Sequence, residues 1–120
     1  MISQLNPSDF AAWRDSAQAA APGSPPVVLD VREPWELQTA SVKEDGFRLV
    51  RIPMREIPAR LAELQEAGGT DQPIACLCHH GMRSLQVADY LQSKGLNRLY
   101  NLTGGIAAWA EQVDPAMARY

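Results

Sequence analysis

The chain has 120 residues, of which 46% are hydrophobic and 21% charged, and its formal net charge is -3. These values are typical of a soluble globular protein of one domain, and a chain without excess positive charge is not expected to bind nucleic acid. No stretch approaches the ~18 apolar residues of a membrane span, and the first residues lack the basic and then apolar pattern of a secretory signal. We therefore expect one domain over residues 1–120, a cytoplasmic location, and no nucleic-acid or membrane partner.

Segments typical of strands and of helices alternate along the chain. Short apolar runs indicate buried strands, whereas apolar residues three or four positions apart and capping signals such as Asn6-Pro7 indicate helices. In chain order the pattern predicts a short edge strand near residue 2, a helix from 6 to the prolines at 22–26, a strand over 27–31, a helical turn from 33, a strand over 48–52, a helix from 57 ended by Gly68-Gly69, a strand over 73–78, a helix over 84–94, a strand over 98–102, a helix from 106 and a loosely packed tail from 114. This alternation predicts an α/β fold with about five strands in a mainly parallel sheet and helices on both faces.

The two cysteines, Cys76 and Cys78, are separated by one residue. A disulfide framework needs more cysteines, spread along the chain. With His79 and His80 following directly, the possible ligands crowd into residues 76–80, which is not the spacing that surrounds a tetrahedral ion, so we expect no metal. Cys76 and Cys78 point to the same side of a strand at nearly the greatest separation that a disulfide can span. Core packing is therefore favoured for Cys76, and a redox role stays open.

The clearest chemical signal is the segment over residues 78–84. A cysteine ends a buried strand, a short loop with a glycine follows, and a helix starts at once. Unpaired amide N–H groups in such a loop and in the first helical turn converge on its centre, and the helix N-terminus and Arg83 add positive charge. We therefore predict an anion-binding active loop in which Cys78 is catalytic and the substrate is bound by His79, His80, Gly81, Met82, Arg83 and Ser84.

Such a loop stabilises a thiolate on Cys78, and it also stabilises a persulfide, whose outer sulfur is anionic. One loop can therefore serve two half-reactions, in which Cys78 takes sulfur from an anionic donor and then passes it to a nucleophilic acceptor. This ping-pong scheme needs no cofactor, because the intermediate is a covalent cysteine persulfide. The opposing interpretation is that Cys78 is an ordinary buried cysteine on a strand, and Gly81 and Arg83 at this spacing disfavour it.

At these residues the sequence resembles the rhodanese-like domain family, whose active loop is written C-x-x-G-x-R. Further stretches agree in order and spacing, namely Leu29-Asp30-Val31-Arg32-Glu33, Ile52-Pro53 and Leu102-Thr103-Gly104-Gly105-Ile106-Ala107-Ala108-Trp109. The resemblance implies a rhodanese-like sheet, Cys78 as the persulfide carrier, and Asp30 and Arg32 as residues that brace the active loop. It also implies a thiosulfate sulfurtransferase type of enzyme, with a small anionic donor such as thiosulfate or a persulfide. The acceptor would be cyanide, a thiol or a protein, and we expect a monomer or a weak homodimer.

Two other functions stay open. One is a non-catalytic rhodanese-like docking or regulatory module, although such modules often lack the cysteine. The other is a Cdc25-like phosphatase or an arsenate reductase, which uses a C-x5-R loop around a tetrahedral oxyanion; here only residues 79–82 separate Cys78 from Arg83, and the shorter loop suits sulfur. The family also often carries a stretch like His-Ile-Pro-Gly-Ala before the third strand. Residues 40–50 contain no histidine, which leaves the shape of that wall of the pocket open.

Several aromatic and apolar residues have two interpretations. His79 and His80 either line the mouth of the site, selecting a donor or relaying a proton, or mainly contribute backbone amides while their rings face solvent. Met82 is either an exposed lip for a partner or a filler. Trp109 is predicted to anchor the core.

Overall fold

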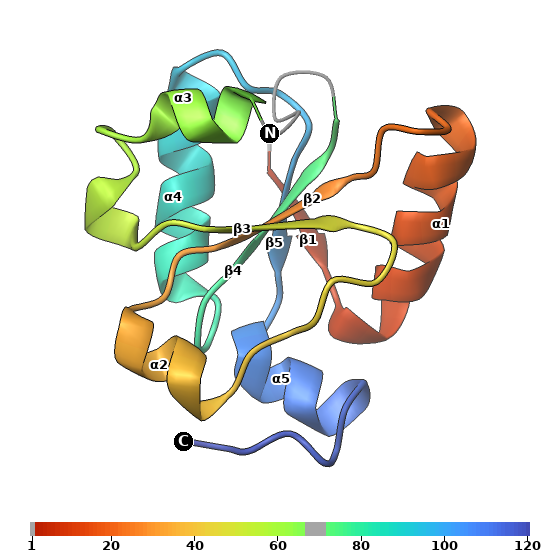
Figure 1. Ribbon diagram of the computed structural model, residues 1–120, viewed down its shortest axis with the longest axis vertical. Coiled ribbons are helices and arrows are strands. Elements are labelled where there is room, and N and C mark those ends of the chain that lie inside the picture. Colours follow the sequence, from red (N-terminus) through yellow and green to blue (C-terminus); the bar gives the residue numbers. More distant parts are fainter. Residues whose placement is uncertain (1, 67–71) are drawn as a thin grey trace.

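The structure is a computed structural model that describes residues 2–66 and 72–120, built around a five-stranded sheet (Figure 1). The strands are β1 (Ser3–Leu5), β2 (Val27–Asp30), β3 (Arg48–Arg51), β4 (Ile74–Leu77) and β5 (Leu99–Leu102). They lie in the order β1-β5-β4-β2-β3, and each neighbouring pair is parallel. The helices are α1 (Phe10–Ala20), α2 (Pro34–Thr39), α3 (Leu61–Leu64), α4 (Met82–Ser93) and α5 (Gly105–Gln112), with 3-10 helices η1 (Pro7–Asp9) and η2 (Met54–Glu56).

The two faces of the sheet are covered by different helices. Alternate residues of β2 point to opposite faces, so Val27 and Leu29 belong to one apolar cluster and Val28 to the other. The first cluster includes residues of α3 and α4, and the second includes residues of α1 and α5, which lie on the other side of the sheet in Figure 1. The predicted α/β class, with about five parallel strands and helices on both faces, is confirmed.

The carboxyl ends of β2 and β4 lie side by side. Asp30 on β2 is in register with Leu77 on β4, and the Val31 N–H donates to the Leu77 carbonyl at 3.0 Å. The chain therefore leaves both strands at the same edge of the sheet, with Cys78 following directly after Leu77. In open parallel sheets this edge is where ligands bind.

Two predicted helices differ from the observed ones. The helix expected from residue 57 begins only at Leu61 as the short α3, with η2 ending just before residue 57, and its predicted end at Gly68-Gly69 lies outside the described residues. Helix α4 begins at Met82 rather than at Ser84, because Gly81 has a φ of 100° and turns the chain into the helix at once. The loop between β4 and α4 is therefore two residues shorter at its C-terminal end than the sequence pattern indicated.

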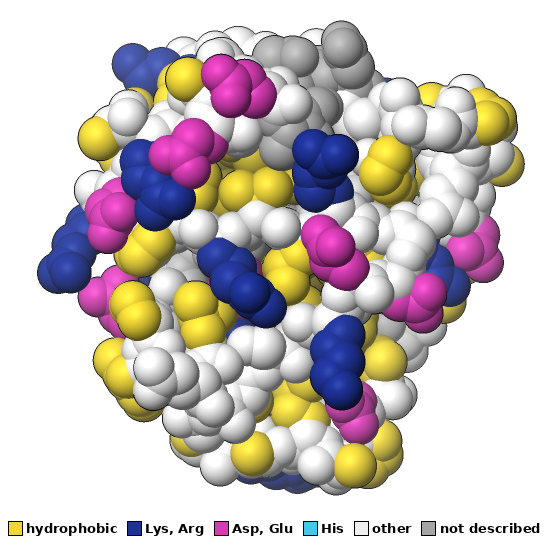
Figure 2. Space-filling model, viewed as in Figure 1, with side chains coloured by type: hydrophobic (Ala, Val, Ile, Leu, Met, Phe, Trp, Pro, Cys, Tyr) yellow, Lys and Arg dark blue, Asp and Glu magenta, His cyan; other side chains and the backbone are white. Residues whose placement is uncertain are grey.

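The tail from residue 114 forms no helix or strand and most of its residues are exposed, as predicted, but two of its side chains pack on the domain. Met117 and Tyr120 pack against the apolar cluster that includes Trp109, because both carry a large apolar surface. In the described part of the chain, no helix is long and apolar enough to cross a membrane. On the face shown in Figure 2, Lys and Arg side chains lie among Asp and Glu side chains.

Candidate active site

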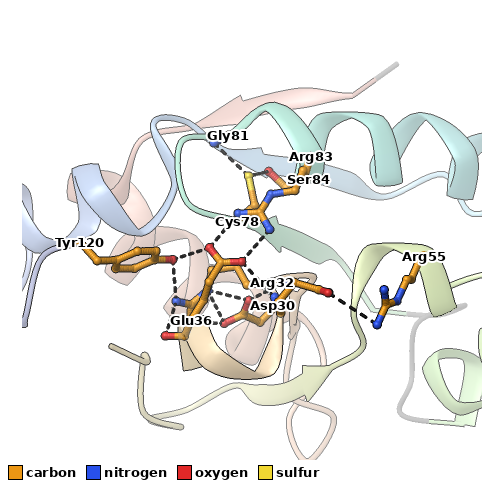
Figure 3. Close-up of polar contacts among 10 residues, drawn as sticks. Asp30, Arg32, Glu36, Arg55, Cys78, Gly81, Arg83, Ser84 and Tyr120 are labelled. Carbon is orange, nitrogen blue, oxygen red and sulfur yellow. Dashed lines mark hydrogen bonds and ion pairs between the residues drawn. The ribbon is translucent and has the colours of Figure 1, made fainter. Parts of the chain in front are cut away.

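Cys78 lies where β4 ends, and its side chain is close to the start of α4 (Figure 3). Its Sγ accepts a hydrogen bond from the Gly81 backbone N–H at 3.0 Å and lies 3.4 Å from the Ser84 hydroxyl oxygen. Cys78 is only 1% exposed, so the loop encloses the sulfur. An N–H donor and the N-terminus of a twelve-residue helix both favour negative charge at this position.

The first turn of α5 holds the backbone of the active loop. The Ile106 N–H donates to the Cys78 carbonyl at 2.8 Å, and the Ala107 N–H donates to the His79 carbonyl at 3.1 Å. The C=O and N–H of a trans peptide lie on opposite edges of one plane, so the N–H groups of these two peptides point away from α5. Helix α5 therefore determines which way the loop amides face.

Two glycines, Gly104 and Gly105, begin α5 next to the loop. Their φ angles are 75° and 62°, a region that residues with a side chain rarely adopt. A Cβ on Gly105 would overlap the carbonyl oxygens of both Cys78 and His79. Gly105 is therefore required by the contact between α5 and the active loop, whereas a Cβ on Gly104 would overlap Ala108 within α5.

Arg83, expected to add positive charge to the loop, directs its forked donors at a carboxylate and not at the sulfur. Its two terminal nitrogens donate to the two carboxylate oxygens of Glu36 at 2.7 and 2.8 Å (Figure 3). The Glu36 side chain is 3% exposed, whereas the Arg83 side chain is 34% exposed. The hydrogen bonds from Arg83 lower the pKa of Glu36 to about 2. The guanidinium of Arg83 is thus held in place by the buried carboxylate of Glu36 on α2.

Asp30 and Arg32 form a second, fully buried ion pair. Arg32 donates to the Asp30 carboxylate from Nε at 2.9 Å and from Nη2 at 2.7 Å. Its remaining terminal nitrogen donates to the Glu36 carbonyl at 3.3 Å and to the Tyr120 hydroxyl at 3.1 Å. Among the described residues, the hydrogen bonds of this pair therefore reach the active loop through Glu36 and Tyr120, not directly.

Tyr120 joins the two ion pairs and covers one side of the loop. Its hydroxyl donates to Glu36 at 2.7 Å, and its ring stacks on His79, which in turn stacks on His80, with ring centres 3.9 Å apart in both cases. Burial raises the pKa of Tyr120 to about 12, so the hydroxyl stays protonated and remains a donor. Burial also lowers the pKa of His79, which is half-buried in the stack. The His80 ring is exposed.

The other residues singled out from the sequence lie either at the rim of the loop or in the core. Met82 is 70% exposed at the rim of the loop. Cys76 is fully buried, and burial raises the pKa of its thiol to about 12. Cys76 and Trp109 therefore pack in the core as predicted. In residues 2–66 and 72–120, the His, Cys, Asp and Glu side chains form no group of three or more that could hold a metal ion.

The model of the rhodanese-like domain family matches residues 8–112 of this sequence. The chain belongs to the rhodanese-like domain family. It is 38% identical over 93 residues to rhodanese-like/PpiC domain-containing protein 12, chloroplastic, of Arabidopsis thaliana, a match that covers 78% of this chain and 30% of that protein. It is 33% identical over 92 residues to a protein named sulfurtransferase of Allochromatium vinosum, covering 77% of this chain and 78% of that protein. A rhodanese-related protein from Thermoplasma volcanium has a similar solved structure, with a TM-score of 0.71, 29% identity and coverage of 92% and 93% of the two chains.

The segment over residues 40–50, where this rhodanese-like domain departs from the family pattern, lies against the core. Ala40, Val42 and Phe47 are buried, and residues 41–47 line a groove of about 550 Å³ with η1, α1 and α5. No residue of the active loop lines this groove. A smaller cleft of about 380 Å³ does reach the loop, and it is lined by Val31, Glu33, Met54, Arg55, Pro58 and Arg83.

Changing Glu36 to Gln is expected to lower the free energy of unfolding at pH 7 by about 2–3 kcal/mol. The pKa of Glu36 is about 2 in the folded protein against an ordinary value of 4.5. A carboxyl with a lowered folded pKa stabilises the fold above its unfolded pKa, and this stabilisation is lost as the pH falls from about 5 toward 2. Urea titrations should therefore show a large difference between wild type and E36Q at pH 7 and almost none near pH 2.

Glu63→Gln is the matched control for this change. Glu63 pairs with Arg60 in the same bidentate manner, at 2.7 and 2.9 Å, but both side chains reach solvent. Because an exposed ion pair contributes little, E63Q should leave the unfolding free energy nearly unchanged at both pH values. An equal loss in both variants would show that the burial of Glu36 has no energetic consequence.

The sequence interpretation missed Glu36, Asn101 and Tyr120. Glu36 could have been noticed, because Glu33-Pro34-Trp35-Glu36 is the pattern of a capping box, and both of its hydrogen bonds are present. Asn101 is an uncommon polar residue inside an apolar strand. Nothing in the sequence indicated that Tyr120 reaches the active loop, which lies far from it along the chain.

Proposed function

We propose that this rhodanese-like domain is a sulfurtransferase that carries sulfane sulfur as a persulfide on Cys78. The donor is a small anion such as thiosulfate, or a persulfide, and the acceptor is cyanide, a thiol or a protein. The observation that carries the proposal is the enclosure of Cys78 Sγ at the N-terminus of α4, with the Gly81 N–H on the sulfur. The similarity to the sulfurtransferase of Allochromatium vinosum supports it.

The first half-reaction starts from the thiolate, whose proton has been released to solvent. Cys78 Sγ attacks the outer sulfur of thiosulfate, the S–S bond of thiosulfate breaks, and sulfite leaves with the electron pair. The product is the persulfide of Cys78. The Gly81 N–H lies on Sγ, and the N-terminus of α4 and the nearby charge of Arg83 stabilise the anionic outer sulfur.

In the second half-reaction the acceptor attacks the outer sulfur and Cys78 leaves as a thiolate. Only 1% of Cys78 is exposed, which favours a small donor in the first step. The persulfide places its outer sulfur about 2 Å beyond Sγ, because that is the length of an S–S bond. A larger acceptor can then reach the transferred atom without entering the loop as deeply as the donor.

Initial-rate kinetics with thiosulfate and cyanide test this proposal. A persulfide intermediate predicts parallel double-reciprocal lines, since sulfite leaves before cyanide reacts. Intersecting lines would contradict the intermediate. Hydrolysis of an aryl phosphate without thiocyanate formation would instead indicate a phosphatase, and neither activity, with no sulfur taken from organic persulfides, would indicate a docking module.

A further inference from the structure

Asn101, on β5, contacts the active loop at two points. Its Nδ2 donates to the Gly81 carbonyl at 3.1 Å, and its Oδ1 is hydrogen-bonded to the Ser84 hydroxyl. Asn101 is 3% exposed and Ser84 is fully buried, so water does not compete for either contact. In the described part of the chain, Gly81 and Ser84 are also the residues hydrogen-bonded to Cys78 Sγ. Asn101 therefore contacts both of them, Gly81 at its carbonyl and Ser84 at its hydroxyl.

The direction of each hydrogen bond follows from the chemistry of the partners. The Gly81 carbonyl can only accept, so the NH2 of Asn101 must face Gly81 and its oxygen must face Ser84. Ser84 then donates its single proton to Asn101. A lone pair of Ser84, rather than its proton, is left facing Cys78 Sγ at 3.4 Å.

With Ser84 accepting rather than donating on this side, Cys78 Sγ needs no proton from Ser84 when it is a thiol or the inner sulfur of a persulfide. A thiol can donate its S–H to the Ser84 oxygen, and the inner sulfur of a persulfide needs no donor. A thiolate, which already accepts a hydrogen bond from the Gly81 N–H, gains a second donor when the Ser84 hydroxyl rotates from Asn101 to Sγ, and this rotation involves no net proton transfer.

We propose that Asn101 is a positioning residue for sulfur transfer, which fixes the Gly81 carbonyl and the Ser84 hydroxyl and so keeps these two residues in place beside Cys78. The proposal rests on the proposed function for its catalytic consequence. Asn101 is fixed from its other side, because Nδ2 also donates to Gln4 at 3.2 Å and Thr103 donates to the same Gln4 oxygen at 3.1 Å. Hydrogen bonds thus connect Gln4 on the edge strand β1 to Asn101 on β5, and Asn101 to the active loop.

A double-mutant cycle tests the proposal. N101L should lower kcat/KM for thiosulfate by at least about 10-fold in the wild-type background and by less than about 3-fold in the S84A background, since part of its effect passes through Ser84. The rate of Cys78 alkylation by iodoacetamide, read by peptide mapping, should show the same dependence on the background. Effects of N101L that are equal in both backgrounds, in both assays, would overturn the role of Asn101.

The two assays separate the proposals. If wild type takes no sulfur from any donor, the proposed function fails, and alkylation still tests the contact among Asn101, Ser84 and Cys78. S93A is the control, because it removes a side-chain hydrogen bond to the Tyr90 carbonyl at the far end of α4 without touching the loop or Asn101, and it should retain kcat/KM within about twofold. If N101L is not obtained folded, N101S is too short to make either contact and provides the same comparison.

Discussion

Replacing Cys78 with serine is expected to reduce sulfur transfer from thiosulfate to cyanide by at least about 10³-fold. The serine oxygen cannot carry a persulfide, and an alcohol stays un-ionised at neutral pH. The side chains are similar in size, and the contacts to the Gly81 N–H and to Ser84 can be kept. Thiocyanate formation measures the activity, and a urea titration shows that the fold is retained.

Cys76→Ala is the control for this prediction. Cys76 lies on the same strand, belongs to the same apolar cluster and is fully buried. Its loss should cost about 1 kcal/mol of stability through the smaller side chain and leave the activity within a few-fold of wild type. Substantial activity in C78S, or an activity loss in C76A as large as that in C78S, would contradict the assignment of Cys78 as the sulfur carrier.

Changing Gly105 to Ala is expected to lower the free energy of unfolding by about 3–5 kcal/mol and to abolish most of the activity. The new Cβ would overlap the carbonyl oxygens of Cys78 and His79, to which α5 donates its hydrogen bonds. Either α5 or the active loop must move, and the loop amides then lose their orientation. Urea titration and the thiocyanate assay measure the two effects.

Gly95→Ala separates backbone strain from this overlap. Gly95 also has a positive φ, of 94°, but a Cβ there meets no atom within 4 Å. G95A should therefore cost only the strain of the left-handed conformation, about 1–2 kcal/mol, and should not change the activity. If G105A behaves like G95A in both assays, the packing of α5 on the loop does not determine the geometry of the site.

Much of the fold could be predicted because its signals are local. The apolar runs at β2 and β4 and the glycine before α4 each depend on neighbouring residues, and the structure has these elements within one or two residues of the predicted bounds. The packing of Met117 and Tyr120 in the otherwise exposed tail was missed, because these side chains contact distant parts of the chain. No local pattern reports such contacts.

The same distinction applies to the site. The loop from Cys78 to Ser84 was found because its residues are consecutive. The partners of the loop come from other elements, Glu36 from α2 and Asn101 from β5. The orientation of Arg83 toward Glu36 therefore could not be read from the loop alone.

Peptide-level mass spectrometry of the wild-type protein after incubation with thiosulfate tests most directly whether Cys78 carries the transferred sulfur. Fragmentation of the peptide that contains both cysteines distinguishes position 76 from position 78. We expect one added sulfur atom, located on Cys78 and released as thiocyanate when cyanide is added. Sulfur located on Cys76, or a peptide that gains no sulfur from thiosulfate or from an organic persulfide, would contradict the assignment of Cys78 as the residue that carries the persulfide.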